Sequence, residues 1–222
     1  MKLISVNIGK IKTYDFDGVI INTALEKFPV FDNVFVHKLG FTGDEQAEKV
    51  IHGGTDKAVC IYPFEHYEYW ENTLNRKIPG NFFGENLTVL GMTEKDVCIG
   101  DIYQIGEVVI QITQPRQPCF KLTYIHNIPK MSYLSQDSGF TGYYVRVLKE
   151  GNLNVNDKIT LIEKNPHNIS VDFTNEILHN DNQNTEAIKK ILQVEEIAAN
   201  LRKSFEKLLA GETIDPRPRL LG

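Results

Sequence analysis

The stretch Val108–Lys121, with the sequence VVIQITQPRQPCFK, begins as a strand and ends as a proline-stiffened segment around one cysteine. The β-branched run 108–113 predicts a strand. Pro115 and Pro118 each fix their own φ at about −65° and disfavour helix at the residue before them, so 114–121 is expected to be stiff and non-helical. Because proline has no N–H, this segment cannot continue a sheet ladder in full.

Cys119 lies between two cations of this segment, Arg116 and Lys121. Nearby positive charge favours the thiolate, which is the form that attacks electrophiles or binds metals. A lone cysteine is also commonly a small buried hydrophobic residue. The residues of the segment alone leave both interpretations open.

The composition is that of an ordinary globular protein. The chain has 222 residues, of which 41% are hydrophobic and 24% charged, and a formal net charge of −5. This balance argues against nucleic acid as a partner. The three cysteines, Cys60, Cys98 and Cys119, fit neither a disulfide framework nor a C-x-x-C zinc site. No signal peptide or membrane span is expected, so we predict a cytoplasmic protein with no membrane partner.

Strand patterns dominate the chain as far as about Glu163. Short apolar runs alternate with glycine-containing turns, which predicts a mainly β fold, a closed or sandwich-like body with a few helical excursions. The turn 15–18 predicts a hairpin between Ile11–Tyr14 and Val19–Asn22. One amphipathic helix is expected from Pro63 to Glu71.

Helical spacing takes over after Asn165. Phe173, Ile177 and Leu178 mark a first short helix, and Thr185 is expected to cap a second. A third carries an apolar stripe from Ile197 to Leu209 and ends at Gly211. Acidic and basic residues balance on this last helix, which is typical of a solvated face and not of a phosphate-binding one.

Polar clusters interrupt the β body at four places: 52–57, 81–87, 114–121 and 138–143. Gly53 and Gly54 would let a ligand approach the backbone closely. Glu85 and Asn86 could hydrogen-bond a heterocycle. Each cluster can equally be an ordinary turn, and none has the fingerprint of a nucleotide-binding or serine-hydrolase site.

Taken in order, the motifs HGGTDKAV (52–59), FGENL (83–87), GD (100–101) and QPRQPCFKL (114–122) resemble the MOSC domain, the C-terminal domain of molybdenum-cofactor sulfurases and its stand-alone relatives. The resemblance implies a MOSC-type β-barrel over 1–164 and a small three-helix domain over 165–222. It implies the molybdenum cofactor (molybdopterin), with Cys119 as metal ligand and catalytic residue. The cofactor-binding residues would be His52, Asp56, Lys57, Glu85, Asn86, Arg116 and Lys121. No local pyridoxal phosphate site is expected.

Stand-alone members of this type resemble 6-N-hydroxylaminopurine resistance proteins, so the resemblance implies a reductase of N-hydroxylated compounds such as 6-hydroxylaminopurine. A redox partner protein would supply electrons. Two alternatives stay open: a non-catalytic carrier of sulfur or cofactor that uses a Cys119 persulfide, and a ligand-binding regulator whose helices contact partners.

Overall fold

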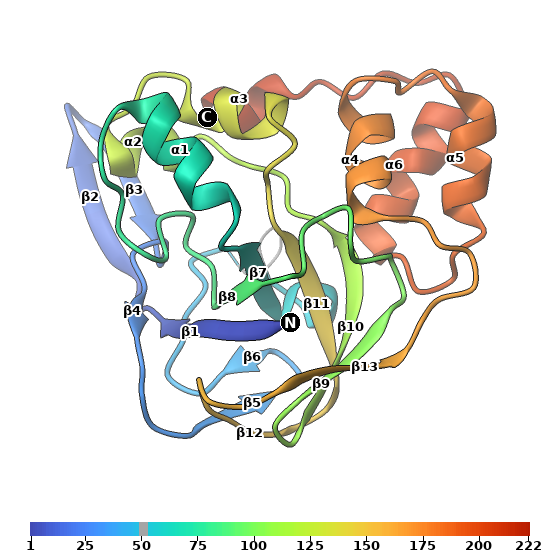
Figure 1. Ribbon diagram of the computed structural model, residues 1–222. Helices are drawn as coiled ribbons and strands as arrows, with labels where there is room; N and C mark the ends of the chain where they lie inside the picture. Colours follow the sequence, from blue (N-terminus) through green and yellow to red (C-terminus); the bar gives the residue numbers. More distant parts are fainter. Residues whose placement is uncertain (49–52) are drawn as a thin grey trace.

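The computed structural model describes residues 1–48 and 53–222, which form a curled β body with helices around its upper edge (Figure 1). The strands are β1 (Lys2–Ile8), β2 (Lys12–Phe16), β3 (Val19–Thr23), β4 (Phe28–Pro29), β5 (Val34–His37), β6 (Gly40–Phe41), β7 (Val59–Pro63), β8 (Leu87–Leu90), β9 (Ile102–Ile105), β10 (Val108–Pro115), β11 (Tyr143–Lys149), β12 (Gly151–Leu153) and β13 (Ile159–Glu163). This confirms the predicted mainly β fold.

Eight strands form one sheet in the order β13-β9-β10-β11-β7-β8-β1-β4. All neighbours are antiparallel except β7 and β8, which are parallel. A parallel pair needs a crossover, and residues 64–86 supply it. The small sheet β12-β5-β6 lies below the large curled sheet in Figure 1, and the hairpin β2-β3 projects from the β body on the left. This hairpin was predicted from its turn.

The helices are η1 (Thr55–Lys57, a 3-10 turn), α1 (His66–Leu74), α2 (Lys121–His126), α3 (Met131–Asp137), α4 (Val171–His179), α5 (Thr185–Leu192), α6 (Ala199–Leu209) and α7 (Arg217–Leu221). Helices α4, α5 and α6 form the expected small helical unit. Among the described residues, no helix is long and apolar enough to cross a membrane.

Two hydrophobic clusters hold the fold together. The larger lies inside the curled sheet and continues into the helical unit, so that Ile110 and Ile112 of β10 share a core with Val171 and Ile188. The smaller is aromatic and lies where α1 and α2 cover the sheet; its centre is Tyr62, Trp70 and Phe83. The boundary at Asn165 stays a prediction.

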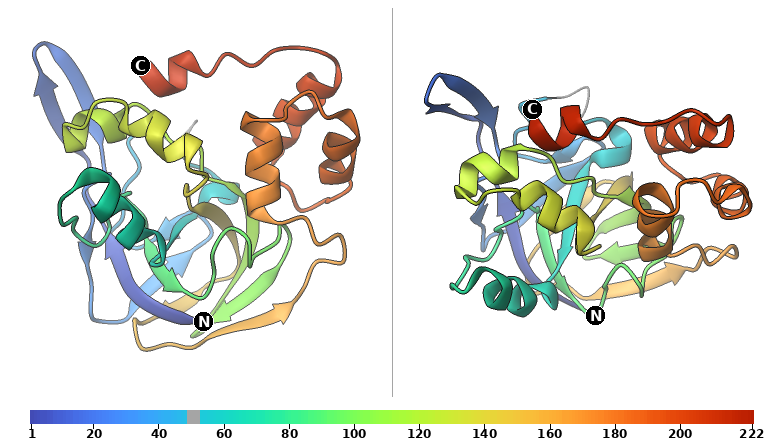
Figure 2. Two further views of the ribbon diagram at one scale, coloured as in Figure 1. Left: turned by 45° about the horizontal axis from the view of Figure 1, so that its top comes forward. Right: turned by 90° about the horizontal axis from the view of Figure 1, so that it is seen from above.

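The last helix leaves the helical unit. Figure 2 shows the chain running back over the top of the molecule after α6, so that α7 lies beside α2 and α3. Two hydrogen bonds hold it there: the Phe120 N–H donates to the Arg219 carbonyl at 2.8 Å, and Ser132 Oγ donates to the Leu220 carbonyl at 2.9 Å. Leu220 is fully buried in this contact.

Several local expectations need correction. Strand β10 continues through Gln114 and Pro115, because a register shift after Ile112 lets both residues pair with β11. Residues 114–120 are non-helical as predicted, and only Lys121 differs, because α2 begins there. Pro63 ends β7 instead of starting α1.

Two helix starts also differ. Asn184, not Thr185, caps α5, since its side chain accepts from the Ala187 N–H at 3.0 Å. Ile197 is buried but precedes α6, which begins at Ala199.

Candidate functional site

The proline–cysteine segment forms one wall of a cavity. We call it the thiol cavity, and its lining includes both thiols of this region together with cations and amides: Cys60, Cys119, Arg116, Asn86, Lys57 and Lys121. Three of the predicted polar clusters, 52–57, 81–87 and 114–121, contribute to this lining, and residues from 23–27 and 44–48 together with Tyr144 complete it.

Cys119 lies in the turn between β10 and α2, and only 9% of its side chain is exposed. The Leu122 N–H donates to its carbonyl at 3.1 Å. The residues on either side are held by α7: the Arg219 guanidinium donates to the Pro118 carbonyl, and Phe120 N–H donates to the Arg219 carbonyl. The cysteine is therefore fixed by a segment about a hundred residues away along the chain.

Arg116 is buried beside the thiols, and its Nη1 atom has no hydrogen-bond partner among the described residues. Burial alone would lower its pKa, but the neighbouring Cys60, Tyr144 and Cys119 raise the pKa above the ordinary value. The guanidinium therefore stays charged. A buried cation with an unused donor is costly unless a ligand accepts from it.

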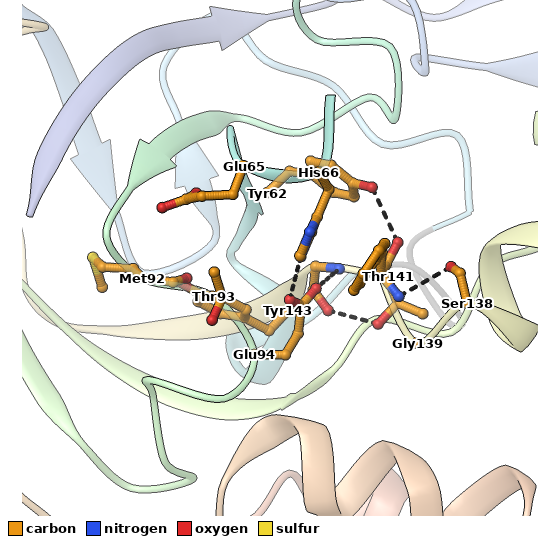
Figure 3. Close-up of polar contacts among 12 residues, drawn as sticks. Tyr62, Glu65, His66, Met92, Thr93, Glu94, Ser138, Gly139, Thr141 and Tyr143 are labelled. Atoms are coloured by element: carbon orange, nitrogen blue, oxygen red, sulfur yellow. Dashed lines mark hydrogen bonds and ion pairs between the residues drawn. The ribbon is translucent and has the colours of Figure 1, made fainter. Parts of the chain in front are cut away.

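The backbone of Arg116 is positioned by a chain of hydrogen bonds. Figure 3 shows the part of this chain around His66 and Glu94. The Arg116 N–H donates to the Gly142 carbonyl at 2.9 Å, and the Gly142 N–H donates to Glu94 Oε1 at 2.7 Å. The other oxygen of Glu94 lies 2.6 Å from Nε2 of His66. His66 in turn stacks on Phe140 with ring centroids 3.9 Å apart. The buried His66–Glu94 pair thus fixes the loop that supports Arg116.

Asn86 connects the cavity to the sheet. Its Oδ1 accepts from the Cys60 N–H at 3.1 Å, and its Nδ2 donates to Asp44 at 2.8 Å. Asp44 also pairs with Lys27 at 2.5 Å, and both side chains are almost fully buried. These contacts hold one charge pair and one amide at the cavity wall.

The two remaining predicted lysines also line the cavity. Lys121 pairs with Glu48 at 2.5 Å and donates to the Asn22 carbonyl at 2.9 Å. The Lys57 amine lies 5.7 Å from the centre of the Tyr144 ring, and burial lowers its pKa.

Asp56 and Glu85 lie outside the lining. Asp56 accepts from the Ala199 N–H at 3.0 Å and pairs with Arg146 at 2.8 Å, so it anchors the start of α6 to β11. Glu85 is fully buried, accepts from Tyr67 and Thr88, and burial raises its pKa. Both positions serve the fold in this structure. His52 lies outside the described residues.

Sequence reasoning missed Cys60, Lys27, Asp44 and Tyr144, which also line the cavity. Cys60 sits in an uninterrupted apolar strand, where it resembles any core residue. Burial raises its pKa to about 11, against an opposing effect of Arg116, so it holds its proton. Only the pairing of β7 with β11 and β8 places it opposite the proline–cysteine segment.

Comparison with known proteins gives the family. The family model of the MOSC domain matches residues 48–160, and that of the YiiM-like 3-alpha helix domain matches 169–212. The chain is 43% identical to the YflK protein of Bacillus subtilis over 205 residues, 92% of this chain and 93% of YflK. It is 37% identical over 167 residues to a Gibberella moniliformis protein named a reductase, covering 73% of this chain but 29% of that protein.

The fold comparison agrees with the sequence comparison. The crystal structure of YiiM from Geobacillus stearothermophilus matches with a TM-score of 0.80 at 36% identity, covering 94% of this chain and 98% of YiiM. The match therefore spans nearly the whole of both chains. The chain belongs to the MOSC domain family, with a YiiM-like three-helix domain after the barrel.

Proposed function

We propose that this protein binds a molybdenum cofactor in the thiol cavity and reduces N-hydroxylated compounds. The observation that carries the proposal is the unpartnered Nη1 of Arg116, a buried charged donor beside Cys119. A donor in this state is satisfied by an anionic ligand, and phosphate and thiolate groups are such ligands.

The residues of the cavity fit a cofactor of this kind. A cysteine thiolate is a soft ligand of the sort that binds transition metals, and Cys119 is held at the wall by fixed backbone contacts. Lys57 and Lys121 also line the cavity, the second paired with Glu48, and Asn86 adds an amide. We propose that Cys119 ligates the metal and that Arg116, Lys57, Lys121 and Asn86 hold the organic part.

When bound, the cofactor would supply the two-electron redox chemistry that these side chains lack. The chain's own part is to bind, orient and exclude water. The buried Arg116 guanidinium fixes negative charge, and the Pro118 turn sets the direction of the Cys119 thiol. Cys60 keeps its proton, because burial raises its pKa to about 11.

Reduction is supported by the relative from Gibberella moniliformis, a protein named a reductase, although this chain matches only 29% of its length. The substrate class follows from the MOSC resemblance of the four motifs. A cytoplasmic location is also proposed, in keeping with three cysteines that are all free thiols.

Molybdenum analysis tests the cofactor role. Wild-type protein, Cys119→Ala, Arg116→Gln and Cys98→Ala are produced in a host that makes the cofactor, and metal per protein is measured. Cys98 is the matched control, because it is also a buried free cysteine but does not line the cavity. We expect Cys119→Ala and Arg116→Gln to lose molybdenum and Cys98→Ala to keep it. Equal molybdenum in all four proteins would contradict the proposal.

The second candidate is a carrier that holds sulfur as a persulfide on Cys119. It is favoured by the presence of two thiols, Cys60 and Cys119, on one cavity. A carrier predicts protein heavier by one sulfur atom, with the extra mass on the Cys119 peptide, and no turnover of N-hydroxylated compounds. Molybdenum together with turnover, and no added sulfur, would reject it.

A further inference from the structure

A second, larger cavity lies next to the thiol cavity. Its volume is about 570 Å³, and it is bordered by β1, β4, the loop 79–82 and the end of α2. Leu25 and Lys27 line both cavities, so the two share one wall. A volume of this size suits a small organic molecule.

Three aromatic rings belong to its lining, those of Phe28, Phe82 and His126. Phe82 and His126 stack with centroids 3.7 Å apart and an interplanar angle of 14°. Phe82 is 2% exposed, which fixes the pair. Phe28 also lines the cavity and leaves 59% of its side chain exposed. Parallel and exposed rings of this kind are the surfaces on which planar heterocycles stack.

His126 adds a directed polar group. Its Nε2 lies 2.7 Å from the Phe82 carbonyl, and since a carbonyl only accepts, Nε2 carries the proton. Burial lowers the pKa of His126 to about 4, so the ring is neutral near neutral pH. Nδ1 is then a bare acceptor, and no hydrogen bond reaches it from the described residues.

The charged groups of the lining are already paired. Lys27 contacts Asp44 at 2.5 Å, and Glu26 contacts Lys12 at 2.7 Å. Lys27 and Glu26 therefore offer no unpaired charge to a charged ligand, whose transfer out of water would cost free energy. A neutral ligand has a smaller desolvation cost.

We propose that this second cavity binds a neutral, planar heteroaromatic ring that donates an N–H to Nδ1 of His126. For a substrate of the proposed reductase, the ring would occupy this cavity and its N-hydroxyl group would reach the thiol cavity past Leu25 and Lys27. Only that placement rests on the proposed function; binding of the ring does not.

The test compares two probes that differ by one donor. Calorimetric titration measures the binding of 9-methyladenine, whose only N–H donors are on its exocyclic amine, and of 9-methylpurine, which has none. A single neutral hydrogen bond predicts that wild-type protein prefers 9-methyladenine by about three- to tenfold. His126→Phe keeps a stacking ring and removes the acceptor, so it should bind both probes equally.

A second variant narrows the cavity. Gly80 lines it, and a Cβ built there meets no atom within 4 Å, so a larger side chain fits without a clash. Gly80→Phe therefore adds a ring at the cavity wall and should weaken binding of both probes. His167→Phe, a substitution at an exposed histidine outside the lining, should keep the preference. Unfolding curves for each variant show whether the fold is kept.

Failure of this inference and of the proposed function can be told apart. Molybdenum content is measured on the same wild-type protein. Equal binding of the two probes by wild type, or an unchanged preference in His126→Phe, overturns the ring site whatever the molybdenum content. A preference that His126→Phe removes, in a protein that takes up no molybdenum, supports the ring site and rejects the cofactor role.

Discussion

Replacing Arg219 with alanine should make Cys119 react much faster with a thiol reagent. Arg219 donates to the Pro118 carbonyl and, at 2.6 Å, to Gln136 Oε1, so its guanidinium ties the cysteine turn to α3. With only 9% of Cys119 exposed, alkylation depends on local opening of this turn. Each hydrogen bond from a charged group contributes about 1.5 kcal/mol or more to the closed state of the turn. Water replaces part of this contribution in the variant, so the free energy of opening the turn should decrease by about 2 kcal/mol. Such a change raises the alkylation rate about 30-fold.

The assay is iodoacetamide alkylation followed by peptide mass spectrometry, which reads Cys60, Cys98 and Cys119 separately. Arg217→Ala is the matched control. It removes an arginine two residues away whose side chain is exposed and contacts only Asp215, and an exposed pair of this kind is worth less than about 1 kcal/mol. Similar rates for Cys119 in Arg219→Ala and in Arg217→Ala would refute the idea that α7 holds the thiol.

Three further outcomes follow from described contacts. Asp56→Ala should lower the free energy of unfolding by about 1–3 kcal/mol, since it removes the acceptor of the Ala199 N–H and leaves Arg146 with Gln111 as its remaining acceptor. Urea unfolding measures this, and Asp215→Ala, at an exposed pair, should change it by less than about 1 kcal/mol. Gly142→Ala should cost at least about 2 kcal/mol more than Gly139→Ala. Both glycines have positive φ, but only at Gly142 would a Cβ lie 2.5 Å from a carbonyl, that of Ile61, and equal costs would contradict this. The free energy of unfolding should also decrease as the pH is lowered, because burial lowers the pKa of His126 and of His179 to about 4 in the folded chain. In the unfolded chain the pKa of each histidine is about 6.5, so the unfolded chain binds protons at a higher pH than the folded chain does. The free energy of unfolding therefore has its highest value above about pH 6.5 and declines toward about pH 4. At about pH 5 the decrease should be about 1–2 kcal/mol per histidine. Urea midpoints that stay constant from about pH 7 to about pH 5 would contradict it.

The β body and the three helices of the YiiM-like unit could be predicted because their periodicities are local. The run 108–113 predicts a strand and the apolar stripe of α6 predicts a helix, each from about a dozen residues or fewer. The motifs also indicated which loops meet at the cavity. Neither kind of pattern gives the direction of an individual side chain.

This is why adjacent predicted residues separate in the structure. Asn86 faces Asp44 at the thiol cavity, whereas Glu85, one residue earlier, faces Tyr67 in the aromatic cluster. The two side chains leave consecutive residues of the loop before β8 in different directions. In the 3-10 turn η1, successive side chains also point in different directions, so Lys57 lines the cavity and Asp56 holds α6.

Other features had no local signal. Helix α7 is five residues long with a proline inside it, and its position depends on partners in α2 and α3. The second cavity combines residues from the first thirty positions with residues near 80 and 126. Such arrangements follow from the three-dimensional packing and have no pattern in any one stretch.

The return of the chain to the cysteine turn has a consequence for the order of folding during synthesis. Strands β1 to β13 and the Pro118–Phe120 turn are made well before Arg219, whose backbone and side chain complete that turn. A nascent chain that has reached Glu163 contains every strand of the barrel, yet the turn still lacks these contacts. Because domains generally fold as they emerge from the ribosome, the barrel should form first and the thiol wall should be completed last. The protein would then acquire a fully ordered cysteine site only after residue 219 has been synthesised.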